Sequence, residues 1–164
     1  MAAYPHWAGG KAAYLIPVET KDGLVVALCR DAGKVEIAWR PKNKDERFYG
    51  LPDGTLYAYE EGDALGVIEA DGRLARVSYA GLRPERAAEN TRPALVRRES
   101  GRNWLLWGDT LMETDARGGL IGTSVLPRVE DYRVMSAGLL LDDGRALRFR
   151  SWDGTMRRLK KPAS

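Results

Sequence analysis

The residues whose side chains are best suited to binding are arginines and a tryptophan near the carboxyl end of the chain. Arg148, Arg150 and Arg157 flank Trp152 within the stretch LDDGRALRFRSWDGTMRRLKK, residues 141–161. A guanidinium group offers a planar fork of donors to carboxylates and phosphates. An indole offers a flat face on which a base or a cation can stack. The stretch therefore predicts a binding surface, and an acidic partner such as nucleic acid is one alternative.

A second group of candidate residues lies near residue 60. Tyr57 and Tyr59 alternate with small or apolar residues, so both side chains belong to one face of an expected strand. Three acids follow the second tyrosine at short spacing: Glu60, Glu61 and Asp63. This pattern predicts an acidic hairpin with two aromatic side chains at its rim.

The charge of the chain is bipolar. Residues 145–161 hold seven basic residues and one acid, a net charge of +6, whereas the whole chain carries +3, so the remainder sums to −3. Residues 60–71 hold five acids and no base. Opposite charges at separate places steer and orient protein partners. They also predict self-association, with the acidic hairpin of one copy against the basic hairpin of another.

The residue types needed for common catalytic and cofactor sites are scarce. His6 is the single histidine and Cys29 the single cysteine, which disfavours a His-based triad, a zinc site and a disulfide. Cys29 closes an apolar run, where a buried thiol is expected. No phosphate-binding glycine loop is present in the sequence. We therefore predict no cofactor, no metal and no catalytic residue, although carboxylates from distant strands leave a small hydrolase as an alternative.

The elements that must position these residues read as short strands joined by tight turns. Asp-Gly pairs recur five times, and this dipeptide suits hairpin turns because glycine adopts positive φ freely. Segments such as KVEIAWR, residues 34–40, alternate apolar and polar side chains. In RALRFR the same alternation predicts Leu147 and Phe149 inward and Arg148 and Arg150 outward.

Grouping the strands predicts four antiparallel meanders, at about residues 11–40, 47–79, 94–126 and 132–159. We expect an all-β class in which the meanders form a single barrel or a two-layer sandwich. Trp39 and Trp104 are expected in its core. One short helix is predicted near residues 84–90, because Pro84 suits a first helical position and Pro93 blocks continuation.

The chain is predicted to be a single all-β domain over residues 11–160. Residues 1–10 are expected to be a flexible amino-terminal segment and residues 161–164 a short tail. Four units of similar length suggest a small propeller or another repeat fold. The irregular spacing of the Asp-Gly pairs disfavours that alternative.

The compartment predicted from composition is the cytoplasm. One cysteine fits a reducing environment, and no apolar run approaches the length needed to cross a bilayer. The first ten residues carry no basic segment of the kind that opens a signal peptide. No membrane association is expected.

These features together predict a binding protein rather than an enzyme. We expect a protein partner, and an inhibitor or an immunity protein that neutralises a toxin or enzyme is the most concrete version. The expected contact residues are the two groups described above: Arg148, Arg150, Trp152, Arg157, Tyr57, Tyr59, Glu60, Glu61 and Asp63. RNA binding through the Arg-rich hairpin is the alternative.

Overall fold

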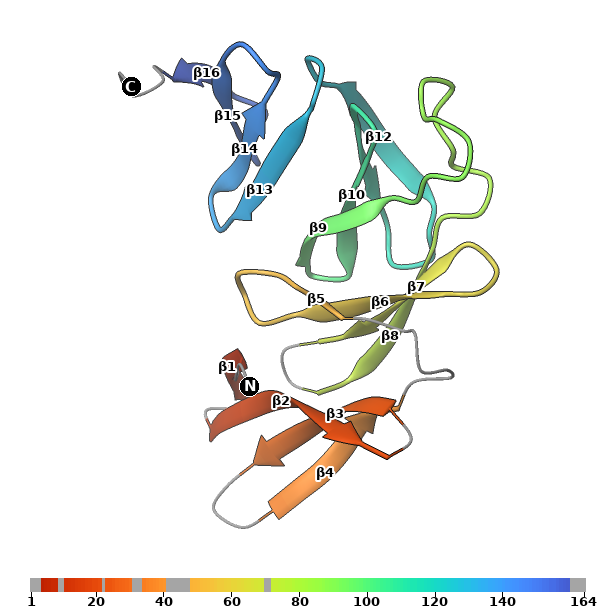
Figure 1. The fold of residues 1–164 in the computed structure, drawn as a ribbon, viewed down its shortest axis with the longest axis vertical. Coiled ribbons are helices and arrows are strands. Elements are labelled where there is room, and N and C mark those ends of the chain that lie inside the picture. The colour runs from red at the N-terminus through yellow and green to blue at the C-terminus, as the bar shows by residue number, and fades with distance from the viewer. Residues whose placement is uncertain are drawn as a thin grey trace. The chain divides into compact units, whose positions relative to one another are not determined.

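The computed structural model describes residues 4–8, 11–21, 23–30, 34–40, 48–69 and 72–159. Within them the chain forms sixteen strands in four antiparallel sheets of four strands each (Figure 1). In every sheet the strands pair in chain order. The predicted all-β class and its antiparallel meanders are confirmed. The chain divides into two compact units, Met1–Ala80 and Gly81–Ser164.

The first unit holds two sheets. The first sheet comprises β1 (Tyr4–Ala8), β2 (Lys11–Thr20), β3 (Gly23–Arg30) and β4 (Lys34–Trp39). The second comprises β5 (Tyr49–Gly50), β6 (Leu56–Glu60), β7 (Ala64–Ile68) and β8 (Leu74–Ser78). Residues 4–8, which lie within the expected amino-terminal segment, form β1, and β1 pairs with β2. Residues 1–3, 9–10 and 160–164, and with them the predicted tail, lie outside the described residues, as do the side chains of His6 and Trp39.

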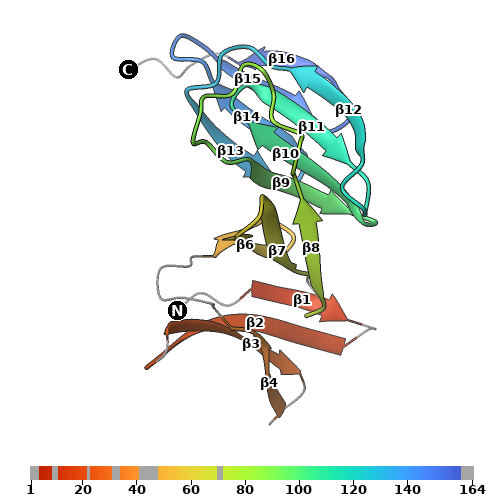
Figure 2. The same cartoon turned by 90° about the vertical axis from the view of Figure 1, so that its right-hand side faces the viewer.

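The second unit also holds two sheets, which pack against each other (Figure 2). One comprises β9 (Ala94–Glu99), β10 (Arg102–Trp107), β11 (Thr110–Thr114) and β12 (Leu120–Val125). The other comprises β13 (Asp131–Met135), β14 (Gly138–Asp142), β15 (Leu147–Ser151) and β16 (Met156–Leu159). Their shared core is a set of buried side chains: Val96, Leu106, Leu111, Leu126, Leu139 and Leu141. This core fixes the two sheets relative to each other.

The Asp-Gly turns explain how the strands reverse direction. At the β15–β16 turn, Ser151 donates to the Thr155 carbonyl at 2.8 Å and Gly154 donates to the Ser151 carbonyl at 3.1 Å. Gly154 takes a φ of 102°, which glycine tolerates and other residues rarely do. Asp153 does not share the positive φ; its carboxylate instead accepts a hydrogen bond from the Thr155 amide at 2.9 Å. The turn between β5 and β6 repeats this geometry.

The predicted single barrel is wrong, because the sheets are four and separate. A single two-layer sandwich would need two sheets, so this alternative is also wrong for the whole chain. The physical reason is that strand pairing stays local. After each fourth strand the chain leaves the sheet by a connection, such as residues 126–130 between β12 and β13, and starts a new one.

The predicted helix at residues 84–90 is also wrong, since the structure describes these residues and shows turns there instead. A helix this short gains little from its own hydrogen bonds. The segment makes one turn bond, from the Ala87 amide to the Pro84 carbonyl at 3.1 Å. The carbonyl of Ala88 accepts hydrogen bonds from the side chains of Arg83 and Thr91. Asn90 then turns the chain with a φ of 61°.

Candidate functional site: a tryptophan cleft

One face of the sheet β9–β12 presents four residues in a row across its strands. Trp104 of β10 pairs with Arg97 of β9 on one side and with Glu113 of β11 on the other. Glu113 in turn pairs with Gly122 of β12. Directly paired residues of antiparallel strands share a face of the sheet. The row therefore ends at Gly122. Because glycine has no side chain, it leaves space on this face of the sheet over β12.

The facing wall is the β15–β16 turn, which carries Trp152. The indole Nε1 of Trp152 donates to the Ser136 carbonyl at 3.0 Å, and its backbone amide donates to the Ala137 carbonyl at 3.3 Å. Ser136 and Ala137 form the turn between β13 and β14. These two hydrogen bonds fix the indole at the margin of the shared core.

The two tryptophans form a cluster with an arginine. The ring centroids of Trp104 and Trp152 lie 6.4 Å apart at an angle of 50°. The guanidinium carbon of Arg97 lies 4.7 Å from the Trp104 centroid and 5.2 Å from that of Trp152. Arg97 also forms an ion pair with Glu99. Cation–π attraction to both rings holds the indoles in place before any ligand binds.

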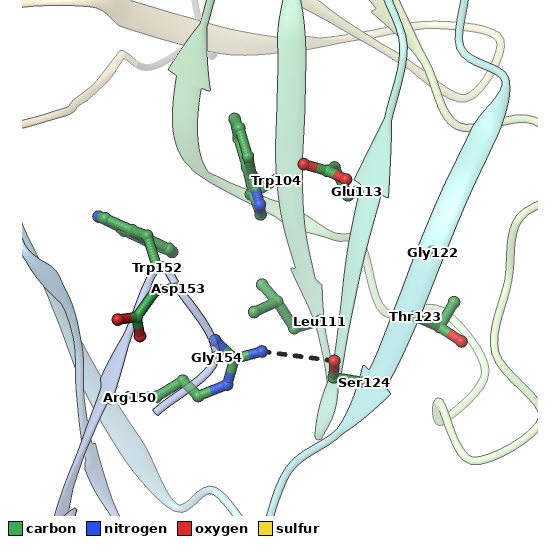
Figure 3. A pocket seen from close by; sticks show the side chains of 10 residues that line it. All are labelled: Trp104, Leu111, Glu113, Gly122, Thr123, Ser124, Arg150, Trp152, Asp153 and Gly154. Atoms are coloured by element: carbon green, nitrogen blue, oxygen red, sulfur yellow. Dashed lines mark hydrogen bonds between the residues drawn. The ribbon is translucent and has the colours of Figure 1, made fainter. Parts of the chain in front are cut away.

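A cleft of about 230 Å³ opens beside these indoles, with walls from β10–β12 and from the β15–β16 turn (Figure 3). Figure 3 shows the Arg150 side chain reaching across it toward Ser124, while the Thr123 side chain points away. The Arg150 Nη2 lies 3.4 Å from the Ser124 hydroxyl, and its Nη1 donates to the Ser151 carbonyl at 2.6 Å. The cleft thus combines aromatic faces with a cation.

Two carboxylates complete the lining, and each already has a structural partner. Glu113 forms an ion pair of 3.2 Å with Arg102. Asp153 accepts the Thr155 amide of its own turn, and this hydrogen bond is the main cause that lowers the pKa of the Asp153 carboxyl, with a smaller contribution from the Arg150 charge. Asp153 therefore remains ionised at neutral pH.

The arginines of the C-terminal hairpin do not lie as the alternation predicts. Arg148 pairs with Leu141 and Arg150 with Leu139, and both leucines belong to the core between the sheets. Arg148 and Arg150 therefore lie on the core-facing side of β15, and Phe149 on the other. The sequence pattern misleads because Leu147 and Phe149 are only half-buried.

The structure separates the four predicted residues of this hairpin. Arg150 and Trp152 both line the cleft. Arg148 instead forms an ion pair with Asp143. Arg157 pairs with Phe149 on the opposite face of the sheet and is exposed. Two of the four predicted residues therefore meet in one site.

The second group of predicted residues lies in the first unit. Tyr49 contacts both Tyr57 and Tyr59. Its ring stacks on that of Tyr57 with the centroids 5.2 Å apart, and it meets the ring of Tyr59 edge-on with the centroids 5.6 Å apart. Tyr57 is buried, so it serves the core rather than a rim. Glu60 forms an ion pair of 3.2 Å with Arg76. The remaining two acids, Glu61 and Asp63, are exposed in the β6–β7 turn.

Sequence reasoning missed Arg97 and Glu113 as parts of a site, and it assigned Trp104 to the core. Trp104 is half-buried and does pack against the core, but it also lines the cleft. The spacing of the hairpin turns on either side of Trp104 was the one sequence signal for these neighbours. In ALVRRESGRNWLLWGDTLMET, two hairpin turns bring Arg97 and Glu113 next to Trp104, but only once the register is known.

Asp143 gives the hairpin a stability that depends on pH. Backbone hydrogen bonds from Ala146 and Arg145, followed by the charge of Arg148, lower the pKa of Asp143 to about 2. A lowered pKa in the folded state adds stability above the unfolded pKa of 3.8, and this is lost as the pH falls through the folded value. We expect the stability difference between wild type and Asp143→Asn to be constant near neutrality and to shrink between about pH 4 and pH 2. Denaturant unfolding across this range measures it, and a difference that persists unchanged to pH 2 would contradict the assignment.

Within the described residues no helix has the length and apolar character of a membrane span, and no group of three or more His, Cys, Asp or Glu side chains is placed to hold a metal ion.

Comparison with known proteins shows similarity in structure and none in sequence family. No protein-family model and no curated protein matches the chain. Among solved structures the chain is similar to apo AztD from Citrobacter koseri, with 13% sequence identity and a TM-score of 0.43. The match covers 95% of this chain and 45% of that one, so this chain spans less than half the length of AztD.

Proposed function

We propose that the chain is a non-enzymatic binding protein that recognises a protein partner through the cleft beside Trp104 and Trp152. The observation that carries this proposal is the pair of indoles held by Arg97 at the cleft. Tryptophan and arginine are among the residues most enriched at the energetic centres of protein interfaces. Their fixed geometry also lowers the entropy cost of binding.

The size of the cleft supports a protein anchor over a free small molecule. Pockets for cofactors and drug-sized ligands measure roughly 300–1,000 Å³, whereas this cleft measures about 230 Å³. That volume suits one large side chain, inserted while the surrounding surfaces make the remaining contacts. Aromatic faces would take its apolar part, and Arg150 would take an acidic or carbonyl group.

The charges at the cleft favour a protein over nucleic acid as its ligand. Arg148 is neutralised by Asp143, and Arg150 lies inside the cleft beside Asp153. A phosphate backbone needs several accessible cations in a row for strong, salt-sensitive binding. The mixed charges of the cleft suit a polar protein surface better.

The carboxylates of the cleft favour binding over hydrolysis. A general acid needs a raised pKa, whereas the turn hydrogen bond lowers that of Asp153. Glu113 is committed to its ion pair with Arg102. If the partner is an enzyme or a toxin, the chain would act as its inhibitor or immunity protein in the cytoplasm.

Filling the cleft tests the proposal without removing any native contact. A Cβ at Gly122 would meet nothing within 4 Å, so Gly122→Leu is expected to fold and to occupy the cleft. The tagged full chain is used to capture proteins from the soluble lysate of its own host, with and without nuclease, and each is quantified by mass spectrometry. We expect one stoichiometric protein that survives nuclease, and about thirtyfold weaker binding of it to Gly122→Leu.

Two controls share the elements of the cleft. Thr123→Leu adds the same side chain one position along β12. Thr123 borders the cleft, but its side chain points away from it, so this variant should retain the partner. Arg150→Ala should weaken capture, while Arg157→Ala, on the opposite face of the same sheet, should not. Capture that is lost with nuclease would mean that nucleic acid is the partner. Equal capture by Gly122→Leu and wild type would overturn the cleft as the site.

A further inference from the structure

Strand β12 is the outer strand of its sheet and is exposed along most of its length. It pairs with β11 alone among the described strands. Leu120, Ile121 and Val125 leave 51%, 46% and 61% of their surface exposed. Alternate residues of an edge strand direct their backbone N–H and C=O groups away from the sheet. Its sequence LIGTSV holds no charged residue and no proline. Its pairing with β11 shifts register between Glu113 and Thr114, so the regular part of this edge is residues 122–125.

The other edge strands of the described residues all carry a feature that blocks edge-to-edge pairing. Charges, prolines and very short strands are the usual protections. β1 contains Pro5, and β5 has only two residues. The remaining five contain charged residues: Lys34 and Glu36 in β4, Arg76 in β8, Arg97, Arg98 and Glu99 in β9, Asp131 and Arg133 in β13, and Arg157 and Arg158 in β16.

The buried face of this sheet also continues onto β12. Thr110, Met112 and Thr114 of β11 are buried, and they pair with Val125, Thr123 and Leu120, respectively. Paired residues share a face, so Leu120 and Val125 extend an otherwise buried face to the sheet margin. A strand added beside β12 would cover them. The cleft lies on the other face, with Gly122 and Ser124.

From these observations we propose that β12 is a self-association edge: β12 of one copy pairs antiparallel with β12 of a second copy. The pairing joins two four-stranded sheets across a two-fold axis, so each copy presents the same surface to the other. It satisfies the outward backbone groups of both strands at once and shields Leu120 and Val125.

The composition of the edge strands favours β12 of a second copy as the strand that pairs with β12. Pairing β12 with any other edge of the described residues would place it against a charge, a proline or a two-residue strand. Pairing it with itself brings two uncharged strands together. This association differs from one between acidic and basic hairpins, because salt weakens attraction between exposed charges and leaves an uncharged edge largely unaffected.

Sedimentation equilibrium of the full chain over a range of concentrations, at low and high salt, tests the proposal. We expect a monomer–dimer equilibrium that high salt does not weaken. Thr123→Lys places a charge on the face of β12 away from the cleft, within the paired segments of both copies, and should weaken dimerisation about tenfold. Met135→Lys puts the same charge on β13, an edge strand that is already charged, and should leave the dimer unchanged.

Hydrogen exchange of the wild type locates the contact without any substitution. Amides of residues 120–125 should gain protection as the concentration rises, while those of β13 and β16 should not. A monomer at every concentration would overturn the proposal. So would a dimer that high salt dissociates, that Thr123→Lys does not weaken, or that leaves the β12 amides unprotected. None of these outcomes bears on binding at the cleft, which is measured separately.

Discussion

Leu139→Ala is expected to lower the free energy of unfolding by about 3 kcal/mol. Leu139 is fully buried and lies in the core between the two sheets of the second unit. Truncating a leucine in such a core removes its transfer free energy and leaves a cavity that the surrounding strands only partly close. Hydrogen exchange on peptides from β9–β16, together with denaturant unfolding of the full chain, measures the loss.

Leu140→Ala is the matched control, because it removes the same atoms from the next residue of the same strand. Leu140 pairs with Phe149 on the opposite face of the sheet and is half-buried. We expect a loss of about 1 kcal/mol there. The comparison also tests which face of this sheet is the inner one. Equal losses, or a larger loss for Leu140→Ala, would contradict the packing described.

Gly138→Ala is expected to cost about 2 kcal/mol for a different reason. A Cβ at Gly138 would lie 2.2 Å from the Arg150 carbonyl oxygen and 2.9 Å from the Ser151 Cα, both backbone atoms of the paired strand β15. The strands would have to separate, since backbone atoms cannot move aside as a flexible side chain does. Arg150 would shift, and Trp152 two residues later would shift with it. Binding at the cleft should therefore weaken together with stability.

Gly122→Ala provides the opposite case within the same unit. Its Cβ would meet open space, and its φ is not positive. Alanine restricts the unfolded chain more than glycine, so stability should be unchanged or rise by up to about 1 kcal/mol. Thermal unfolding of both variants decides the matter. A destabilised Gly122→Ala or a neutral Gly138→Ala would contradict the contacts at these positions.

The sequence predicted the meanders well because their signals are local. Alternation over five or six residues and a turn residue between two such runs suffice to predict a hairpin. The repeat was harder to see. In the sheet β5–β8, Asp-Gly lies in the first and third hairpins (Asp53-Gly54 and Asp71-Gly72). In the sheet β13–β16 it lies in the second and third (Asp143-Gly144 and Asp153-Gly154). Its spacing therefore cannot report the period, although the same four-stranded unit occurs four times in the described residues.

The site was only partly predictable, because it depends on register and on contacts between sheets. Arg150 and Trp152 attracted notice through residue type, but nothing local shows that Leu139 and Leu141 face inward while Phe149 does not. That outcome is fixed by packing against Leu106 and Leu111. The role of Gly122 is invisible in the sequence, since its contribution is the absence of a side chain beside Glu113.

Strand pairing in chain order has a kinetic consequence. Every pairing in the described residues joins strands that follow each other along the chain, so each sheet closes only short loops. Folding is faster when contacting residues are close in sequence, and loop closure costs less entropy when the loop is short. Each sheet can therefore complete its backbone hydrogen bonds as soon as its fourth strand has emerged from the ribosome. The strands of each sheet can therefore be paired before those of the next sheet have emerged.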